Sequence, residues 1–523
     1  MNSHTQKLVP NAARPGRAAG GPARSHASPT WAYAVCILLA GVAFAMFVFF
    51  LDRYPPFYVD EPAFNASAAR YVSGQGFVYP LHTQAPHADD VWAYHGPFFP
   101  RMQVLTFLWL GVSHWACRFP GFLGAHLAVL VLCIYLLRLG LWRSSVALAT
   151  AWVGDRSTQL VLLGRPDGVS HFLVVLGFVL LLRGLDRRSC RLLSTSCVCV
   201  GMAIGFSPAA VFFGPALAAA VFLWLPRQAW IRALGAMAGG ALLPAVLFLV
   251  CWLPDIPASF EQFTWYAKQS TKGEWVATVP ERLMAVWRMP YWAKYWILGL
   301  VVSSCVLAVR IMGRGNAPRI ERTGTRLNMV PKAALLFTIA AIALFLNSSM
   351  HAYYFVFFTI WPVVALASAW ETGLFSGRWR VPIVAWTCVL AFAWVLSLTW
   401  NLTRFREAWQ DYDSLDKRPM ELMIGRCFPR GGEMACDPVY FVVIHRVGMR
   451  YTPLPFYRSD PGLSLRDRDY CLLSSRYVDM LNSSDPGWRS GRSLVLADMV
   501  FRDSYSLQHN YFIYAPGVHT ADE

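Results

Sequence analysis

The sequence predicts a polytopic α-helical membrane protein that carries a small α/β domain at its C-terminal end. Of its 523 residues, 56% are hydrophobic and 15% are charged, and the mean hydropathy is +0.39. This composition is far from that of an ordinary soluble domain. Several apolar runs reach or approach the roughly 20 residues that a helix needs to cross the bilayer core. Basic residues gather in alternate connections between these runs, which is the positive-inside pattern.

The first thirty residues, 1–30, are rich in Pro, Gly, Ala and Ser and predict a disordered cytoplasmic tail. The apolar run that follows is long and lacks a small-residue cleavage site, so a signal peptide is not favoured. We expect a membrane domain over 31–400 with about eleven transmembrane helices. The number of helices depends most on two places. The span at 144–163 contains the charged residues Asp155 and Arg156, and the run broken at Ser207-Pro208 could be one kinked helix or two helices. The predicted spans are 31–51, 119–138, 144–163, 168–184, 192–206, 209–225, 232–253, 291–312, 332–347, 352–370 and 381–400.

The net charge of +16 would suggest a nucleic-acid partner in a soluble protein, so its distribution decides the interpretation. Basic residues precede the first span or cluster in loops of one parity, as at 183–191 and 310–332. This pattern predicts a cytoplasmic N-terminus. It places the large loops 52–118 and 254–290 and the tail 401–523 on the opposite side. We therefore expect contact with membrane lipids and no nucleic acid.

An acidic pair, Asp60-Glu61, lies shortly after the first apolar run, at the start of a polar segment. Phe64, Ala68 and Tyr71 follow at helical spacing, and two glycines end the segment, which predicts an amphipathic helix on the membrane surface. In the structural alternative, Asp60 is simply the N-cap of this helix. The two roles are compatible, because a carboxylate at a helix start is also fixed in direction.

Two further motifs fall on the same predicted side of the membrane. A turn around His95 precedes an apolar segment that ends at Arg118, and Arg165 and Asp167 stand two residues apart between two spans. Charges at a membrane boundary are costly enough to suggest function by default. The alternative for the second motif is an interfacial ion pair in which Asp167 caps the following helix.

More positive charge lies in the second large loop, 254–290, which contains Lys268, Lys272 and Arg282, while His351 precedes a late span. These residues are candidates to bind an anionic group. For the three loop residues the alternative is a solvated loop attracted to anionic lipid. For His351 the alternative is an interfacial cap.

The tail, 401–523, predicts a separate domain, because short apolar or aromatic segments bounded by Pro, Gly, Asn and Asp are typical of strands. We also expect a helical stretch around 414–425. An obvious catalytic constellation is missing, so a lid or an acceptor-docking module is the plainer interpretation. The twelve cysteines show no spacing of metal type, and the pairing of the three in the tail cannot be read from sequence. The predicted strands are Tyr440–Ile444, Tyr470–Ser474, Leu494–Val500 and Asn510–Tyr514.

Taken in order, these motifs resemble the polyprenyl-phosphate-sugar-dependent glycosyltransferases of the GT-C superfamily, which include protein O-mannosyltransferases and lipid A aminoarabinose transferases. The resemblance covers about 31–400. It rests on the acidic pair, the turn before a surface helix, an arginine opening the second span, the Arg-x-Asp motif and a Tyr-Tyr-rich start to a late span. Two positions depart from the pattern: Gly96 stands where the turn usually has Pro, and Ser207-Pro208 stands where many members have Lys-Pro.

The resemblance implies an inverting transferase that moves a hexosyl or pentosyl group from a polyprenyl-phosphate donor to a hydroxyl of a lipid, glycan or protein. It implies the outer face of a bacterial inner membrane, with the C-terminal domain in the periplasm. A lipid-phosphate leaving group carries no nucleotide diphosphate, so a divalent metal is possible but not required. Asp60 would be the general base, with Glu61 and Asp167 beside it. The candidate cations for the departing phosphate are Arg165 first, then His95, Lys268, Arg282 and His351.

Two other classes of protein share this hydropathy. A transporter or lipid flippase without transferase activity would commonly show internal repeats and broken helices near the midplane. No repeat is visible by inspection, and apart from Asp155-Arg156 the ionisable residues gather at the outer boundary. A catalytically silent relative that acts as a structural partner is the third possibility.

Overall fold

The computed structural model describes most of the membrane part of the chain and the paired strands of its C-terminal part. The predicted features outside the described residues include Asp60, Lys272, Arg282, His351 and the span at 291–312 apart from residues 304 and 307. The described residues are 28–52, 61–78, 85–87, 90–93, 95–154, 163–253, 255–270, 304, 307, 325–347, 357, 359–374, 380–410, 418–428, 433–436, 440–453, 470–474, 492–502 and 508–516.

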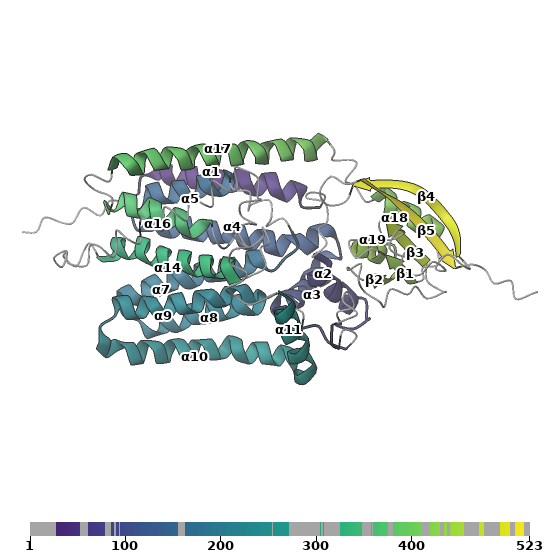
Figure 1. Cartoon of the computed structure of the whole chain (residues 1–523), viewed down its shortest axis with the longest axis horizontal. Helices are drawn as coiled ribbons and strands as arrows, with labels where there is room; N and C mark the ends of the chain where they lie inside the picture. Colours follow the sequence, from purple (N-terminus) through teal and green to yellow (C-terminus); the bar gives the residue numbers. More distant parts are fainter. Residues whose placement is uncertain are drawn as a thin grey trace, which may run out of the picture.

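Long apolar helices lie side by side and form a bundle (Figure 1). Within the described residues, five helices are long and apolar enough to cross a membrane, which confirms a multi-pass membrane protein. The predicted number of eleven stays a prediction. The five spanning candidates are α1 (Thr30–Phe50), α4 (His114–Arg138), α7 (Asp167–Arg187), α10 (Arg227–Trp252) and α14 (Thr325–Asn347).

The remaining helices of the bundle agree with most of the predicted spans. A short 3-10 turn after Ser207 joins two helices, so the predicted break at Ser207-Pro208 is confirmed. Helix α17 continues beyond the predicted domain boundary at 400. These elements are α5 (Trp142–Gly154), α8 (Cys190–Phe206), η1 (Pro208–Phe212), α9 (Phe213–Trp224), α16 (Ile360–Glu371) and α17 (Arg380–Gln410).

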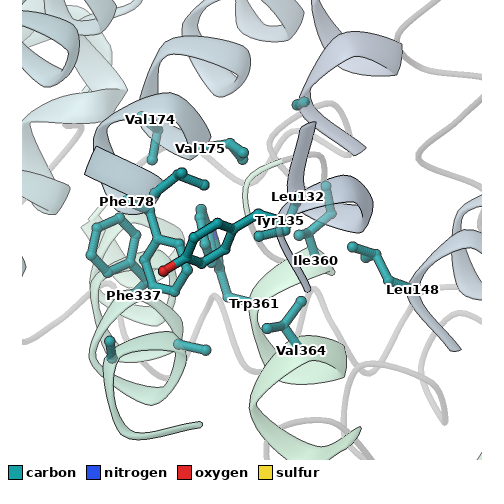
Figure 2. Close-up of a cluster of buried hydrophobic side chains, with 14 of the residues drawn as sticks. Leu132, Tyr135, Leu148, Val174, Val175, Phe178, Phe337, Ile360, Trp361 and Val364 are labelled. Carbon is teal, nitrogen blue, oxygen red and sulfur yellow. The ribbon is translucent and has the colours of Figure 1, made fainter. Parts of the chain in front are cut away.

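Helices α4 and α7 form the centre of the bundle, because most of their apolar length is buried, whereas α1 and α10 are largely exposed. The exposed face of α10 is apolar, as expected of a helix that contacts lipid. Large side chains fill the space between α4, α7, α14 and α16. Figure 2 shows Tyr135, Phe178, Phe337 and Trp361 in this cluster, where the ring of Trp361 lies 4.7 Å from Phe337 and 5.0 Å from Phe178.

The predicted helix after the acidic pair is confirmed as α2 (Glu61–Val72), but the exposed polar face expected of an amphipathic helix is missing from its first turns. Every residue from Glu61 to Ala69 is buried. The helix packs against α3 (Phe98–Leu110), α4 and the C-terminal domain. Sequence periodicity showed only the apolar face, whereas packing from several sides buries the polar face as well.

The C-terminal part is an α/β unit with a mixed sheet in the order β2-β1-β3-β5-β4. β1 pairs in parallel with β2 and β3, and β5 pairs antiparallel with β3 and β4. The predicted strands at 470–474, 494–500 and 510–514 are confirmed within β3, β4 and β5. The elements are α18 (Arg418–Cys427), β1 (Glu433–Cys436), α19 (Phe441–Arg446), β2 (Arg450–Pro453), β3 (Tyr470–Ser474), β4 (Arg492–Arg502) and β5 (Gln508–Pro516).

The predicted strand at Tyr440–Ile444 is wrong, because this segment forms the helix α19. All five of its residues are buried. A short, continuously apolar run suits either a buried strand or a buried helix, and periodicity does not distinguish the two. Helix α19 also contacts α2, where the Ser73 hydroxyl and Nδ1 of His445 lie 3.0 Å apart. The C-terminal domain is therefore attached to the helix that follows the acidic pair.

Candidate active site

The candidate site lies where α2, α4 and α7 begin, at the end of the bundle next to the C-terminal sheet (Figure 1). Glu61 is the first residue of α2, and Asp167 is the first residue of α7. Arg118 lies near the start of α4. Three segments that are far apart in the sequence thus bring their charged residues to one end of the membrane bundle.

Glu61 and Arg118 form a buried ion pair. The Arg118 Nε atom donates to Glu61 Oε2 at 2.9 Å, and Nη2 donates to Oε1 at 2.8 Å. The two side chains are 0% and 1% exposed, respectively. Such two-pronged contacts between a guanidinium and a carboxylate fix direction as well as distance. Glu61 therefore anchors the start of α2 rigidly to α4.

The backbone around this ion pair is held equally closely. The Gly164 N–H donates to Glu61 Oε2 at 2.8 Å, and the Asn65 side chain donates to the carbonyl oxygens of Glu61 and Gly164 at 2.8 and 2.7 Å. A Cβ atom at Gly164 would lie 2.9 Å from both Glu61 Oε2 and Asn65 Nδ2, so only glycine fits. Arg118 also donates to the Leu51 carbonyl at the end of α1. The ion pair therefore joins four segments.

Arg165 and Asp167 form a second buried ion pair, with 3.0 Å between Nε and Oδ2. The Ser207 hydroxyl donates to the other carboxylate oxygen, Oδ1, at 3.0 Å. The alternative interpretation of an ion pair is confirmed, but its cap is wrong, because the N-cap of α7 is Pro166 and no side chain caps the helix. Ser207, which departs from the Lys-Pro of the resembling enzymes, thus orients Asp167 through a hydroxyl.

Phe64 connects this second pair with His95. The Arg165 guanidinium lies over the Phe64 ring, 4.8 Å from its centroid, a distance suited to a cation–π contact. The His95 ring meets the same ring edge-on at 5.1 Å. The structure therefore brings together Glu61, Arg165, Asp167 and His95, all four predicted site residues whose side chains it describes.

His95 is buried and uncharged at neutral pH. Burial, and then the nearby positive charge of Arg165, lower the pKa of His95 to about 3, although a hydrogen bond to the Phe206 carbonyl opposes them. Among the described residues, Nδ1 of His95 has no hydrogen-bond partner. Because a neutral imidazole has one donor and one acceptor nitrogen, donation from Nε2 to Phe206 leaves Nδ1 as an acceptor.

Gly96 follows His95 at a point where the chain passes very close to the end of α8. A Cβ atom at this position would meet the carbonyl oxygen of Gly205 and would lie 2.8 Å from that of Phe206. No side chain, including that of proline, fits without a shift of the backbone. The departure of Gly96 from the resembling turn therefore has a steric reason in this chain.

The other predicted site residues are not brought into this cluster by the described part of the structure. Lys268 belongs to helix α11 (Ile256–Ser270), and only its backbone is described. Asp60, Arg282 and His351 lie outside the described residues. The residues 28–270 and 325–516 that are described contain no group of three or more His, Cys, Asp or Glu that could hold a metal ion.

The site also contains residues to which the sequence interpretation gave no role. Arg118 was only a mark of the resemblance, and its partner Glu61 lies 57 positions earlier in the chain. Asn65 and Ser207 were not predicted as partners of the charged residues. Asn65 lies one helical turn after Glu61, so a contact between them could have been predicted from the helical spacing. The contact between Ser207 and Asp167 could not, because it depends on the packing of α7 against α8.

A cavity of about 460 Å³ lies beside the site. Tyr71, Phe77 and Trp92 supply aromatic walls, and Asp90 and Arg101 supply opposite charges. The Trp92 indole donates to the Ala63 carbonyl of α2 at 3.1 Å, which joins the cavity wall to the first turn of that helix. Cavities with apolar walls and a few convergent polar groups are typical of small-molecule sites.

No protein-family model matches the sequence, and no curated protein matches it. The fold is similar to that of ArnT from Cupriavidus metallidurans in the apo state, with 13% identity and a TM-score of 0.48, covering 92% of this chain and 98% of that chain. The same protein bound to undecaprenyl phosphate gives 13% identity and a TM-score of 0.47, covering 93% and 98%.

The apo oligosaccharyltransferase from Archaeoglobus fulgidus gives 12% identity and a TM-score of 0.48, covering 94% of this chain and 75% of that chain. At these identities the likeness concerns the fold and does not say what this chain binds or transfers.

Proposed function

We propose that the protein is a membrane glycosyltransferase that moves a sugar from a polyprenyl-phosphate donor to a hydroxyl of a lipid, glycan or protein. The observation that carries this proposal is the convergence of the Glu61–Arg118 and Arg165–Asp167 pairs at one end of a membrane-spanning bundle. A lipid-anchored phosphate resides at the membrane boundary, where such a site would meet it. The motif order that resembles GT-C transferases supports the same reaction.

In this reaction the oxygen of the acceptor hydroxyl attacks the anomeric carbon, and the bond between that carbon and the phosphate oxygen breaks with inversion. We propose that Asp60 takes the hydroxyl proton as general base. Both oxygens of Glu61 are engaged by Arg118 and Gly164, so Glu61 acts as a positioning residue. Consecutive Cα atoms are about 3.8 Å apart, so an anchored Glu61 also restricts where Asp60 can lie.

Negative charge that develops on the departing phosphate needs a fixed positive partner. We assign this role first to Arg165, because Asp167, itself held by Ser207, fixes the direction of its guanidinium, and burial strengthens its field. Asp167 thus orients Arg165 instead of reacting itself. Lys268, Arg282 and His351 stay proposed as further phosphate ligands.

His95 receives a different role from the cationic one, because it is neutral at the pH of the cell. Its Nδ1 atom is suited to accept a hydrogen bond from a hydroxyl. We therefore propose that His95 contacts a hydroxyl of the sugar or the acceptor. The neighbouring cavity with Phe77 and Trp92 has the size and the mixed lining to hold a sugar ring.

We further propose that the site faces the outside of a bacterial inner membrane, with a cytoplasmic N-terminus and a periplasmic C-terminal domain. The distribution of basic residues supports this orientation. The C-terminal domain contacts α2 across a second cavity of about 260 Å³ that includes Arg70 and His445. This contact supports a role as a lid or an acceptor-docking module.

Mass spectrometry of envelope glycans, from cells with and without the protein, tests the proposed activity. We expect one glycan, lipid or protein to lose the mass of a single sugar when the protein is absent. An unchanged envelope, together with movement of a lipid-linked sugar across reconstituted vesicles, would instead indicate a transporter and contradict the proposal.

A further inference from the structure

A basic cavity of about 160 Å³ lies at the other end of the bundle, between the ends of α4 and α7 and the beginning of α14. Arg138, Arg183 and Arg187 line it, together with Asp186 and Tyr135. Three guanidinium groups thus face one carboxylate, which leaves the lining positive. Neither the candidate active site nor its proposed reaction uses these residues.

The cavity is far from the candidate active site along α4. Arg118 and Arg138 lie twenty residues apart on this helix, which corresponds to about 30 Å at 1.5 Å per residue. The hydrocarbon core of a bilayer is about 30 Å thick. The two groups of charges are therefore about one bilayer thickness apart.

One arginine of this cavity is held by a neighbouring side chain, and the other two lie at helix ends. Arg183 is half-buried, and its guanidinium lies 5.8 Å from the centroid of the buried Tyr135 ring. Arg138 and Arg187 lie in the last turns of α4 and α7, where a helix dipole favours positive charge. The topology rule and the dipole explain why arginines occur at this end, but not why three converge around one cavity between helices.

We propose that this cavity binds the phosphate of an anionic membrane lipid headgroup. Basic pockets between membrane-spanning helices are the recurrent sites for such headgroups. Guanidinium groups bind phosphate oxygens through charged hydrogen bonds. Leu182 and Met329 give the cavity an apolar wall next to its charges, as a headgroup with an attached acyl chain requires. A soluble phosphate shares the headgroup chemistry but makes no use of the apolar wall.

The test uses the purified full chain in phosphatidylcholine nanodiscs that contain a minor fraction of phosphatidylglycerol. Native mass spectrometry measures how much phosphatidylglycerol stays bound. We expect Arg138→Gln and Arg183→Gln each to weaken its binding by about tenfold, because each removes a charged hydrogen bond. Arg138 is exposed, so its replacement leaves folding intact even if the Arg183 variant is unstable.

Arg191→Gln is the matched control, because Arg191 is an exposed arginine near the same end of the bundle but outside the cavity. Its variant should retain phosphatidylglycerol like the unaltered protein. Equal losses in the control and cavity variants would mean a diffuse surface charge and would overturn the proposal. Displacement of the lipid by inorganic phosphate, with the same dependence on Arg138, would assign the cavity to a soluble phosphate and overturn the lipid assignment.

Discussion

Glu61 and Arg118 show how a charged pair can be structural and still serve a reaction. Their contact is buried, and both carboxylate oxygens of Glu61 accept hydrogen bonds. Burying two charges is costly, and hydrophobic replacements often stabilise a protein just as well. We therefore interpret the pair as a device that fixes direction: it determines where α2 begins, and with it the position of the residue before Glu61.

Replacing Glu61 by Gln should lower the free energy of unfolding by about 3 to 5 kcal/mol, because Arg118 would be left buried without its charge partner. Thermal unfolding of the purified protein measures this loss. Glu261→Gln is the control, because Glu261 is 65% exposed and its ion pair is with His87, which is 39% exposed. Its loss should stay below about 1 kcal/mol. A Glu61→Gln variant as stable as the unaltered protein would refute the anchoring role.

His95 makes the protein sensitive to acid. The pKa of about 3 in the folded protein lies below the ordinary histidine pKa of 6.5, so between these values the unfolded chain binds a proton that the folded chain does not. Stability from this residue is complete above pH 6.5 and decreases as the pH falls. The loss reaches about 2 kcal/mol at pH 5. The His95→Gln variant should lose less stability than the unaltered protein between pH 7 and pH 5 in thermal unfolding, and equal losses would contradict the buried, neutral state.

The sequence predicted the Arg165–Asp167 pair because its members lie two residues apart at a membrane boundary. It could not predict the Glu61–Arg118 pair, because the 57 positions between the two residues are bridged only by the packing of α2 against α4. The same limit applied to Ser207 as the partner of Asp167. Local charge patterns identify candidate residues, whereas their partners depend on tertiary contacts.

At the scale of elements, close approach of α4 and α7 positions the Arg165–Asp167 turn. A Cβ atom at Gly121 would lie 2.6 Å from the Arg165 carbonyl oxygen, and one at Gly124 would lie 2.7 Å from the backbone of Val169. A Cβ atom at Gly168 would meet the Gly121 carbonyl oxygen. Glycines on both segments therefore allow the backbones to touch, as small residues do between membrane helices.

We expect Gly168→Ala to destabilise the protein by about 1 to 3 kcal/mol and to reduce transfer, because the added methyl group pushes the Arg165–Asp167 turn away from α4. Gly239→Ala in α10 is the control. A Cβ atom at Gly239 has no neighbour within 4 Å, so this change should be neutral or stabilising by up to about 1 kcal/mol. Thermal unfolding and a transfer assay measure both variants, and equal behaviour would show that the close approach does not matter.

The C-terminal elements show what local patterns leave open. The strands at 470–474 and 494–500 were predictable because they are short runs, largely apolar or aromatic. The run at 440–444 is even richer in aromatic and β-branched residues but forms the helix α19, because it packs on all sides between the sheet and α2. The strand order, with parallel and antiparallel neighbours, depends on contacts that composition does not contain.

At the scale of the whole molecule, composition alone predicted a multi-pass membrane protein, because burying and covering so much apolar surface requires lipid. The positions of α1, α7, α8 and α10 followed from their apolar runs. Which helices form the centre of the bundle could not be predicted in this way. Helices α4 and α10 are similarly apolar, but only α4 is largely buried.

The proposed orientation makes a prediction about the two ends of α4. A reporter fused after Gly76 should be active only outside the cytoplasm, and one fused after Gly140, in the turn that follows α4, should be active only in the cytoplasm. Reporter activity on the same side for both fusions would contradict a membrane-spanning α4. Cytoplasmic activity after Gly76 would remove the site from the outer face.

In the proposed mechanism the acidic base Asp60, which precedes α2 in the sequence, drives sugar transfer, and the Asp60→Asn variant tests this most directly. Single-turnover transfer from a polyprenyl-phosphate sugar, by purified protein of confirmed fold, should fall by about 10² to 10⁴-fold. Asp52→Asn, which removes an exposed carboxylate from the preceding segment, should transfer at the unaltered rate. An Asp60→Asn variant that transfers sugar as fast as the Asp52→Asn control would contradict the claim.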